Sequence, residues 1–456
     1  MGEVAVAWGH DSPRARYALD VLLGLLGTAS RDARPDEQAT LGYAAVGASV
    51  LVPAGPQEGW DEPRPSLTRI GRLPVLHRPG DSPRPPSTGD LGFDALYAAY
   101  ACLTAPWEAV DPRNEVGTPT AAEGWLGRNG LLEEPLVHRY AEALRELLAE
   151  AGVATRRRKA ALVLTHDVDE QFGRLFGVRE SLVRLGRDLR RGRPGSIRRT
   201  AGLARQLARH WRNDPNDRWD EWCRLLGDWA GASTFFVASF NLFDRGAGRF
   251  DVAYDVRRPE VAREVCSLAQ AGAEVGIHFS LQANTSADQV VRERVRLEDA
   301  LGLEIRSCRH HWWALGPDPL RTLRFHAQAG MRVDCSFGFN DRPGFRRGIA
   351  APFRLFDPVS GSPLPLVSLP TIVMDRALFD GRRSADEALE SLCSLYRRTA
   401  EVGGDYVLDW HSHVLNPAVA HGAGRGLVEF VAYAREHGAT LRRPLELAGE
   451  LDSATP

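Results

Sequence analysis

The sequence lacks the patterns that mark membrane-spanning, secreted and disulfide-stapled proteins. No apolar run approaches the roughly 18 residues of a membrane-spanning helix. The first residues show no basic segment followed by an apolar core, so we expect no signal peptide and a cytoplasmic protein. The six cysteines include no C-x-x-C pair, which argues against a zinc finger or a disulfide scaffold. They are Cys102, Cys223, Cys266, Cys308, Cys335 and Cys393.

A strong net charge is also missing. Lys plus Arg number 57 and Asp plus Glu 59, so the net charge of -2 indicates neither an acidic nor a basic partner, and we expect no nucleic acid. The hydrophobic share of 43% with 25% charged residues is that of a globular protein. A chain of 456 residues exceeds one ordinary core and favours two domains. The basic run 156–159 marks the boundary between residues 1–155 and 156–456.

The first domain reads as a smaller α/β unit. Apolar patterns predict strands at 3–9 and 43–52, helices at 14–27, 92–104 and 134–152, and an irregular connection rich in Pro, Arg and Gly at 53–90. No cluster of residues in it indicates chemistry. It is an accessory domain of unknown role, and a lid, a dimer surface and a binding module all remain open.

In the second domain, short apolar runs alternate with helical stretches. The runs are 161–165, 233–238, 273–277, 303–308, 331–335, 366–370 and 405–410. Alternation of this kind predicts parallel strands joined by right-handed helical crossovers. A (β/α) barrel of about seven units satisfies the pattern, and an open doubly wound sheet is its rival.

Two carboxylates follow the first apolar run of this domain. Residues two apart in an extended strand point to the same side, so Asp167 and Asp169 would face one spot together. Unpaired carboxylates at the end of an apolar strand are costly, and a bound cation would resolve the cost. A surface turn is the alternative, since Asp is common where strands end.

Further polar residues follow the later strands. They are His278, Arg309, His310, His311, Asp334 and His411. In a parallel barrel these strand ends converge on one mouth, where active sites are found. A single histidine after a strand is usually structural, but several opposite a carboxylate pair favour a catalytic site.

Several of these stretches resemble a known family. They are Thr165–Asp169, Thr234–Val237, Val275–His278, Arg309–Trp312 and Trp410–His411. In this order they are similar to the polysaccharide deacetylases, the NodB-homology domains of carbohydrate esterase family four. A bacterial subgroup with an extra N-terminal α/β domain is more similar still. Matches to that subgroup are Phe345–Gly348, Pro352–Phe353, Leu369–Pro370 and Met374–Asp375. The resemblance covers most of 160–415 and, more weakly, 93–145.

The resemblance implies a distorted (β/α)7-type barrel and metal-dependent removal of acetyl groups from sugars. It also implies a role for each matched position. Asp167 corresponds to the general base, Asp169 to the metal-binding carboxylate, His278 to the first histidine ligand, Arg309 to the arginine that orients the base, and His411 to the acid, while Asp334 falls near the fourth motif.

The sequence departs from the family pattern at two positions. Val168 separates the two aspartates, which are adjacent in the family. Gln282 stands where the second histidine ligand is expected, four residues after the first. His311 is the candidate replacement, because the subgroup tends to carry Arg-x-His there.

The chemistry is coherent with these residues. A cation held by one carboxylate and two imidazoles leaves positions open for water and a substrate carbonyl. We expect a divalent ion, with zinc the first choice. Trp312, Trp313 and Trp410 lie beside these groups, where they could stack on a sugar ring or pack in the core.

The segment 179–212 holds eleven arginines and only two acids, Glu180 and Asp188. Such a charge run is usually a solvated helical insert. Since it follows the first barrel strand, it could instead bind an anionic substrate, such as a nucleotide- or lipid-linked N-acetylated sugar, or an anionic membrane surface.

Three functions compete. The leading one is a metal-dependent hydrolase that removes acetyl groups from an N-acetylated sugar or glycan precursor. A catalytically impaired homologue that binds carbohydrate is the second, because of the Gln282 change. The third is an iron oxygenase, since two histidines and one carboxylate also make its triad. Strand–helix alternation argues against that third function.

Overall fold

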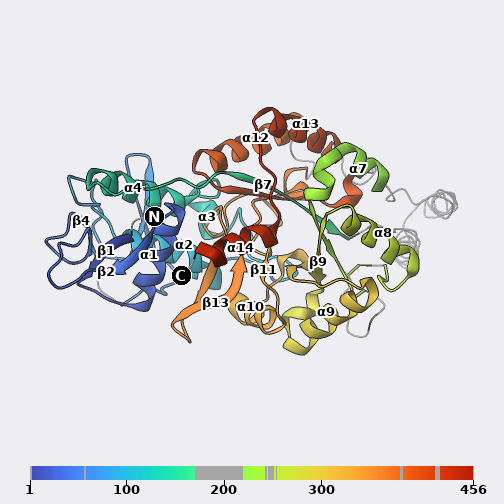
Figure 1. Ribbon diagram of the computed structural model, residues 1–456, viewed down its shortest axis with the longest axis horizontal. Helices are drawn as coiled ribbons and strands as arrows, with labels where there is room; N and C mark the ends of the chain where they lie inside the picture. The colour runs from blue at the N-terminus through green and yellow to red at the C-terminus, as the bar shows by residue number, and fades with distance from the viewer. Residues whose placement is uncertain are drawn as a thin grey trace, which may run out of the picture.

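A computed structural model describes residues 3–55, 58–169, 219–241, 244, 251–252, 254–379, 384–415 and 422–454. It has two parts, a smaller N-terminal block (blue in Figure 1) and a larger barrel domain. The predicted arginine-rich insert at 179–212 lies outside the described residues. The six cysteines are free thiols. Within the described ranges, no helix is both long and apolar enough to cross a membrane.

The N-terminal block is built on a parallel sheet with strand order β2-β1-β3-β4. Its strands are β1 (Glu3–Trp8), β2 (Ala29–Asp32), β3 (Leu41–Tyr43) and β4 (Val50–Val52). Its helices are α1 (Pro13–Leu25), α2 (Ala95–Thr104), η1 (Pro106–Ala109), α3 (Trp125–Arg128) and α4 (Leu136–Glu150). Two residues fix the start of α1: the Ser12 hydroxyl accepts a hydrogen bond from the Ala15 backbone N–H, and Pro13 occupies the first turn.

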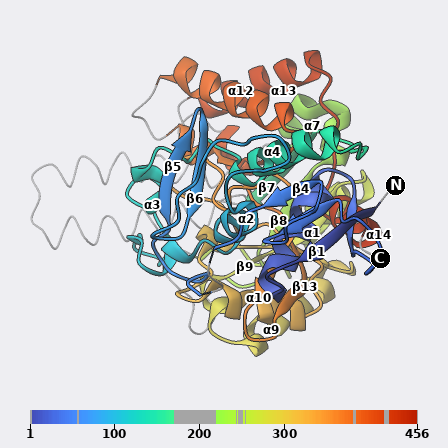
Figure 2. The ribbon, with the colours of Figure 1, turned by 90° about the vertical axis from the view of Figure 1, so that its left-hand side faces the viewer.

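Two predictions for this block are wrong in detail. The stretch 43–52 is not one strand, because the chain turns between β3 and β4 through Ala44 (φ 53°) and Gly47 (φ 93°). The stretch 53–90 is not all irregular, since it contains an antiparallel hairpin of β5 (Ser66–Ile70) and β6 (Leu73–His77). Gly71, at φ 60°, supplies the left-handed residue that a two-residue hairpin loop requires. Figure 2 shows the two strands side by side.

The barrel domain holds a nine-stranded sheet of order β12-β13-β11-β10-β9-β8-β7-β15-β14. Its strands are β7 (Ala161–Val168), β8 (Thr234–Val237), β9 (Glu274–Phe279), β10 (Ser307–His310), β11 (Val333–Asp334), β12 (Phe353–Asp357), β13 (Ser362–Ser368), β14 (Val373–Met374) and β15 (Asp405–Asp409). All neighbours pair in parallel except β12 and β13. The predicted parallel barrel-type α/β architecture is confirmed.

Helices surround the sheet, as Figure 1 shows. They are α7 (Trp219–Leu226), η2 (Gly227–Ala232), α8 (Pro259–Gln270), η3 (Leu281–Asn284), α9 (Ala287–Leu301), η4 (His311–Trp313), α10 (Pro319–Gln328), α11 (Asp375–Leu378), α12 (Ala385–Glu401), η5 (Ser412–Leu415), α13 (Ala423–Glu436) and α14 (Pro444–Ala454). The long α12 begins with a capping box, in which Ser384 and Glu387 satisfy each other's backbone N–H groups.

The edges of the nine-stranded sheet are β12 and β14, and β12 pairs with β13. The connection 369–372 joins β13 to β14. Leu369 N–H donates to the Asp334 carbonyl of β11 (2.9 Å), and Ile372 N–H donates to the Val407 carbonyl of β15 (3.0 Å). This single stretch of backbone is therefore hydrogen-bonded to strands from both sides of the sheet.

The barrel interior is a separate apolar layer. It consists of Val163, Phe236, Val333, Cys335, Val367, Leu369 and Val407, with Leu447 and Ala448 of α14. Gly276 is required there, since a Cβ on it would lie 2.6 Å from the Phe236 ring. The α14 residues plug the amino-terminal end of the strands, and the functional groups gather at the carboxyl-terminal end.

A buried ion-pair cluster joins the two parts of the molecule. Glu108 of the N-terminal block binds Arg346 at 2.8 and 3.0 Å and Arg347 at 3.2 Å. All three side chains are buried. Burial opposes ionisation, but the two guanidinium groups hold the pKa of Glu108 below its usual range. The apolar core also runs continuously through both parts, so the N-terminal block is packed against the barrel and not tethered to it.

We predict that Glu108→Gln lowers the free energy of unfolding by about 3–5 kcal/mol, because two buried arginines lose their counter-charge. Urea unfolding followed by circular dichroism measures the change. Glu390→Gln is the matched control, since its pair with Arg397 is exposed (71% at Glu390) and should contribute less than about 1 kcal/mol. Equal effects of the two variants would contradict the prediction.

Candidate metal centre and catalytic site

A small cavity of about 70 Å³ opens at the carboxyl-terminal end of the barrel strands. It is lined by Asp167, Asp169, His311, Trp312, Trp313, Asn340, Met374, Arg376, Asp409 and His411. These residues come from the ends of β7 and β15 and from the segments that follow β10, β11, β14 and β15. Parallel strands bring their carboxyl ends together, which explains how residues far apart in sequence reach one pocket.

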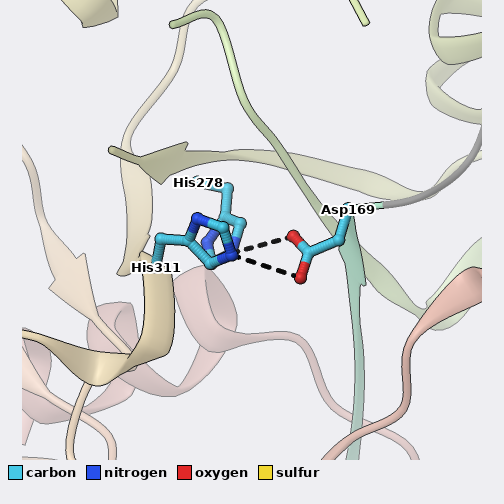
Figure 3. Close-up of side chains that lie close together, drawn as sticks. All are labelled: Asp169, His278 and His311. Carbon is cyan, nitrogen blue, oxygen red and sulfur yellow. Dashed lines mark ion pairs between the residues drawn. The ribbon is translucent and has the colours of Figure 1, made fainter. Parts of the chain in front are cut away.

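The carboxylate of Asp169 lies among imidazoles. His278 Nε2 is 3.2 Å from its Oδ1, and His311 Nε2 is 3.4 Å from its Oδ2 (Figure 3). Metal bonds of about 2.0–2.2 Å at tetrahedral angles separate two ligand atoms by about 3.3–3.6 Å. The ligand atoms of Asp169, His278 and His311 all lie within 4.8 Å of one another. The three residues therefore have nearly the spacing of a tetrahedral metal site.

Contacts around these side chains fix their orientation. His278 Nδ1 lies 3.2 Å from the Arg309 carbonyl oxygen, and His311 Nδ1 lies 3.9 Å from Asp251. Each ring thus presents Nε2 to the centre, as metal-binding histidines do. Asp169 Oδ1 and His278 Nε2 are buried without a hydrogen-bond partner among the described residues. Buried polar atoms left in this state fit a divalent cation.

The electrostatics of the group agree with its geometry. Burial disfavours the ionised carboxylate, but His311 and His278 hold the pKa of Asp169 well below its usual range. Burial likewise opposes charge on His311, yet Asp169 raises its pKa to about 10. A cation would replace that proton, so metal binding at this centre releases protons.

Gln282 takes no part in this group. It lies in the turn η3, half-buried, and its backbone N–H donates to Ser280 Oγ (3.2 Å). The structure brings His311, and not Gln282, to the carboxylate.

Asp167 is held by a buried arginine. Its Oδ1 accepts a hydrogen bond from Arg309 Nη1 at 2.8 Å, and its Oδ2 faces His278 Nε2 at 3.5 Å. Both aspartates therefore point to the same histidine, as the period of two predicts, while Val168 between them is buried in the core. Burial raises the pKa of Asp167, but Arg309, His278 and His411 together outweigh it and hold the pKa below its usual value.

His411 forms a pair with Asp375, a residue whose role the sequence reasoning missed. Its Nδ1 lies 3.0 Å from Asp375 Oδ1, and its Nε2 lies 3.4 Å from Asp169 Oδ2. Burial opposes protonation, but Asp375 and Asp409 raise the pKa of His411 well above its usual value. The imidazole is thus held as a proton donor that points into the cavity.

Asp409 was missed as well, although a signal existed. It lies two residues before His411, the same spacing that picked out Asp167 and Asp169. Its Oδ1 is 3.0 Å from Arg309 Nη1. Burial and the nearby Asp167 raise the pKa of Asp409 well above its usual range, against the opposing effects of Arg309 and His411.

Asp334 lies elsewhere. Its carboxylate accepts hydrogen bonds from the Ser336 backbone N–H (2.9 Å) and hydroxyl (2.8 Å), and lies 3.0 Å from His326 Nδ1 and 3.4 Å from Cys308 Sγ. Asp334 pairs in register with Cys308, whose neighbour Arg309 faces the pocket, so both point to the outer side of the sheet. We infer that it fixes the register of β10 and β11 and does not touch substrate.

The three tryptophans have different surroundings. Trp312 is half-buried on the cavity rim, and Trp313 lines the cavity with 2% of its surface exposed. Trp410 is fully buried and packs edge-on against Phe379. Trp410 does not line the cavity described here. Its position favours core packing over contact with a sugar.

No protein-family profile matches the chain, and no curated protein sequence matches it. A solved structure from Mycobacterium smegmatis, named a polysaccharide deacetylase, is similar with a TM-score of 0.40 and 18% identity over 65% of this chain and 91% of that one.

Two further solved structures are similar to the chain, and both carry CE4 in their names. A CE4 family pseudoenzyme from Bacillus anthracis matches with a TM-score of 0.32 and 12% identity, over 64% of this chain and 66% of that one. The Xyl-CE4 domain of a multidomain xylanase, from the hindgut metagenome of Trinervitermes trinervoides, matches with a TM-score of 0.31 and 9% identity, over 65% and 92%. The functional conclusion comes from the geometry of the site itself.

We predict about one divalent ion per chain in the purified protein, bound by Asp169, His278 and His311. His311→Gln should lose most of this metal in elemental analysis, because one of three protein ligands is gone. His437→Gln is the matched control, since that exposed histidine contacts Tyr433, through its carbonyl (2.8 Å) and its ring (3.9 Å between ring centroids), and does not line the cavity. Unchanged metal in His311→Gln would remove His311 from the ligand set. Loss from His326→Gln instead would assign the ion to the Cys308–His326–Asp334 group.

Proposed function

We propose that this protein is a metal-dependent hydrolase that removes acetyl groups from an N-acetylated sugar by cleaving the amide bond. One observation carries the proposal. A carboxylate with two imidazoles, spaced as metal ligands, lies beside a second carboxylate that a buried arginine keeps ionised. The first group suits a divalent cation, zinc being the first choice, and the second suits a general base.

The cavity suits an acetyl group in size and polarity. Its volume of about 70 Å³ is enough for a small group such as an acetyl. The ionisable residues form one wall, and Trp313, Met374 and Ala377 form a small apolar cluster at another. An acetyl methyl would pack against the apolar wall, with its carbonyl oxygen towards Asp169 and the imidazoles.

Asp167 would accept the proton of the attacking water. Arg309 Nη1 donates a hydrogen bond to Asp167 Oδ1 (2.8 Å), which holds the carboxylate in place and favours its ionised form. Asp167 Oδ2 lies 3.5 Å from His278 Nε2, so the base is next to the metal-ligand group. A bound divalent cation supplies Lewis acidity there, which acidifies water and polarises the acyl oxygen. Asp169, His278 and His311 would hold that cation.

His411 would donate a proton to the departing amine, which leaves poorly as an anion. The Asp375 carboxylate at 3.0 Å keeps Nδ1 occupied, so Nε2 is the nitrogen that reaches the substrate. Asp167 and His411 thus divide the work, one accepting a proton and the other giving one.

The sugar would lie outside the cavity, against its rim. Trp312 is half-buried there, and the exposed Arg376 also lines the opening. The positive charge of the Arg376 guanidinium suits a substrate with a phosphate near the acetylated ring, such as a nucleotide- or lipid-linked sugar. Acetate release from sugar nucleotides, lipid-linked sugars and neutral oligosaccharides, assayed side by side, tests the activity and its substrate class. Bound saccharide and bound metal without acetate release would instead favour a carbohydrate-binding protein.

We predict that the Asn variants of the two aspartates fail differently. Asp167→Asn keeps the metal but loses the proton acceptor, so kcat should fall by about 10²–10⁴ with little change in KM. Asp169→Asn removes the only anionic ligand, so metal content should drop and excess metal should restore part of the activity. Elemental analysis with acetate-release kinetics separates the two. Metal loss from Asp167→Asn together with retention in Asp169→Asn would reverse the assignment.

A further inference from the structure

Two consecutive tryptophans on the cavity hold a backbone conformation that costs free energy. Trp312 has φ 58° and Trp313 has φ 50°. Among the described residues other than glycine, only Ala44 and Ala105 share a positive φ, and neither lines the cavity. Left-handed backbone at bulky residues persists only where surrounding contacts impose it, and it concentrates at functional sites.

One of the two hydrogen bonds that hold the Trp312 carbonyl comes from the N-terminal block, and the other comes from the barrel. The Trp312 carbonyl oxygen accepts one hydrogen bond from Thr118 Oγ1 and one from Asn340 Nδ2, both at 2.9 Å. Thr118 is 1% exposed and is itself fixed, because its backbone N–H donates to Asn114 Oδ1 (2.9 Å).

The segment 118–122 of the N-terminal block is also hydrogen-bonded to the loop that carries Asn340. The Asp341 carboxylate accepts hydrogen bonds from the backbone N–H groups of Ala121 (2.8 Å) and Ala122 (3.0 Å). Thr118 and Asn340 therefore approach the Trp312 carbonyl from two chain segments that hold each other in position.

A second connection runs from the block to Trp313. Glu108 binds Arg346, and Arg346 Nη1 donates to the Gly338 carbonyl at 2.9 Å. Gly338 lies flat against the Trp313 ring, since a Cβ on it would be 2.9 Å from three ring carbons. The position of the ring thus depends on a glycine whose carbonyl is held by an arginine paired with the N-terminal block.

We infer that the N-terminal block positions Trp312 as the platform on which the sugar ring stacks and keeps Trp313 in place as the cavity wall beneath it, with Thr118 as a positioning residue that determines affinity for saccharide. The inference rests on the proposed function for the identity of the ligand, a pyranose ring next to the acetylated nitrogen. The half-buried indole of Trp312 offers such a ring an apolar face at the cavity rim. The N-terminal block therefore supports one side of the substrate site.

The test compares Thr118→Val with Thr120→Val in the metal-loaded, full-length protein. Both changes replace a hydroxyl by a methyl in the same loop. Thr118 donates to Trp312, whereas the Thr120 hydroxyl donates to the Pro112 carbonyl at 3.3 Å. Thr118→Val should raise KM for the best substrate about three- to tenfold, the range expected for one hydrogen bond, with kcat within about twofold. Thr120→Val should leave both unchanged.

A binding readout separates this inference from the activity. Titration with diacetylchitobiose, followed by tryptophan fluorescence, should show weaker binding by Thr118→Val by a similar factor, and acrylamide should quench its tryptophans more readily. If wild type releases no acetate but these differences appear, the proposed function fails and the positioning role stands. Wild-type binding by Thr118→Val, equal weakening in both variants, a loss confined to kcat, or no saccharide binding by wild type would overturn the inference.

Discussion

One fully buried guanidinium, that of Arg309, holds the site and the barrel together. Its Nη1 binds Asp167 (2.8 Å) and faces Asp409 (3.0 Å), while Nη2 donates to the hydroxyls of Thr165 (2.8 Å) and Thr371 (3.0 Å). A buried charge costs several kcal/mol unless it is paired, so these partners are obligatory. They come from β7, from β15 and from the connection 369–372. The charge that keeps the Asp167 carboxylate ionised therefore also anchors the backbone between β13 and β14.

The arrangement separates two chemical roles by surrounding two neighbouring carboxylates differently. Asp167 meets a permanent cation, which favours its ionised form. Asp169 meets imidazoles, whose protons a metal ion could displace. Asp409 adds a third carboxyl, and burial together with Asp167 raises its pKa well above the usual range. The inserted Val168 makes this possible, because it turns into the core and leaves both aspartates on the pocket side.

The apolar runs in the sequence predicted most strands of the barrel, because such a run is a property of a single segment. The two-residue period of a strand likewise predicted that the side chains of Asp167 and Asp169 point to the same side. The register between neighbouring strands cannot be read from one segment. For that reason the sequence placed Asp334 at the mouth of the barrel, with the other polar residues that follow strands. Its strand is only Val333–Asp334, and pairing with Cys308 turns the carboxylate outward. Asp375 escaped for a similar reason, because it starts a four-residue helix and meets His411 only through the parallel pairing of β14 with β15. The hairpin β5–β6 was hidden by Pro and Arg in the stretch, although Pro is tolerated in an edge strand such as β6.

The division into two domains suggested by sequence also changes meaning in the folded protein. A block without chemistry of its own looked like an appendage, because no motif in it carries catalytic residue types. Hydrogen bonds to backbone carbonyls leave no such motif, and the contact from Thr118 to Trp312 is of this kind. The buried charges of Glu108, Arg346 and Arg347 lock the block against the barrel, so its loop keeps a fixed distance from the cavity rim. Strain at the two left-handed tryptophans is then held by the whole interface, which explains how a bulky aromatic pair can keep that backbone at the opening of the cavity.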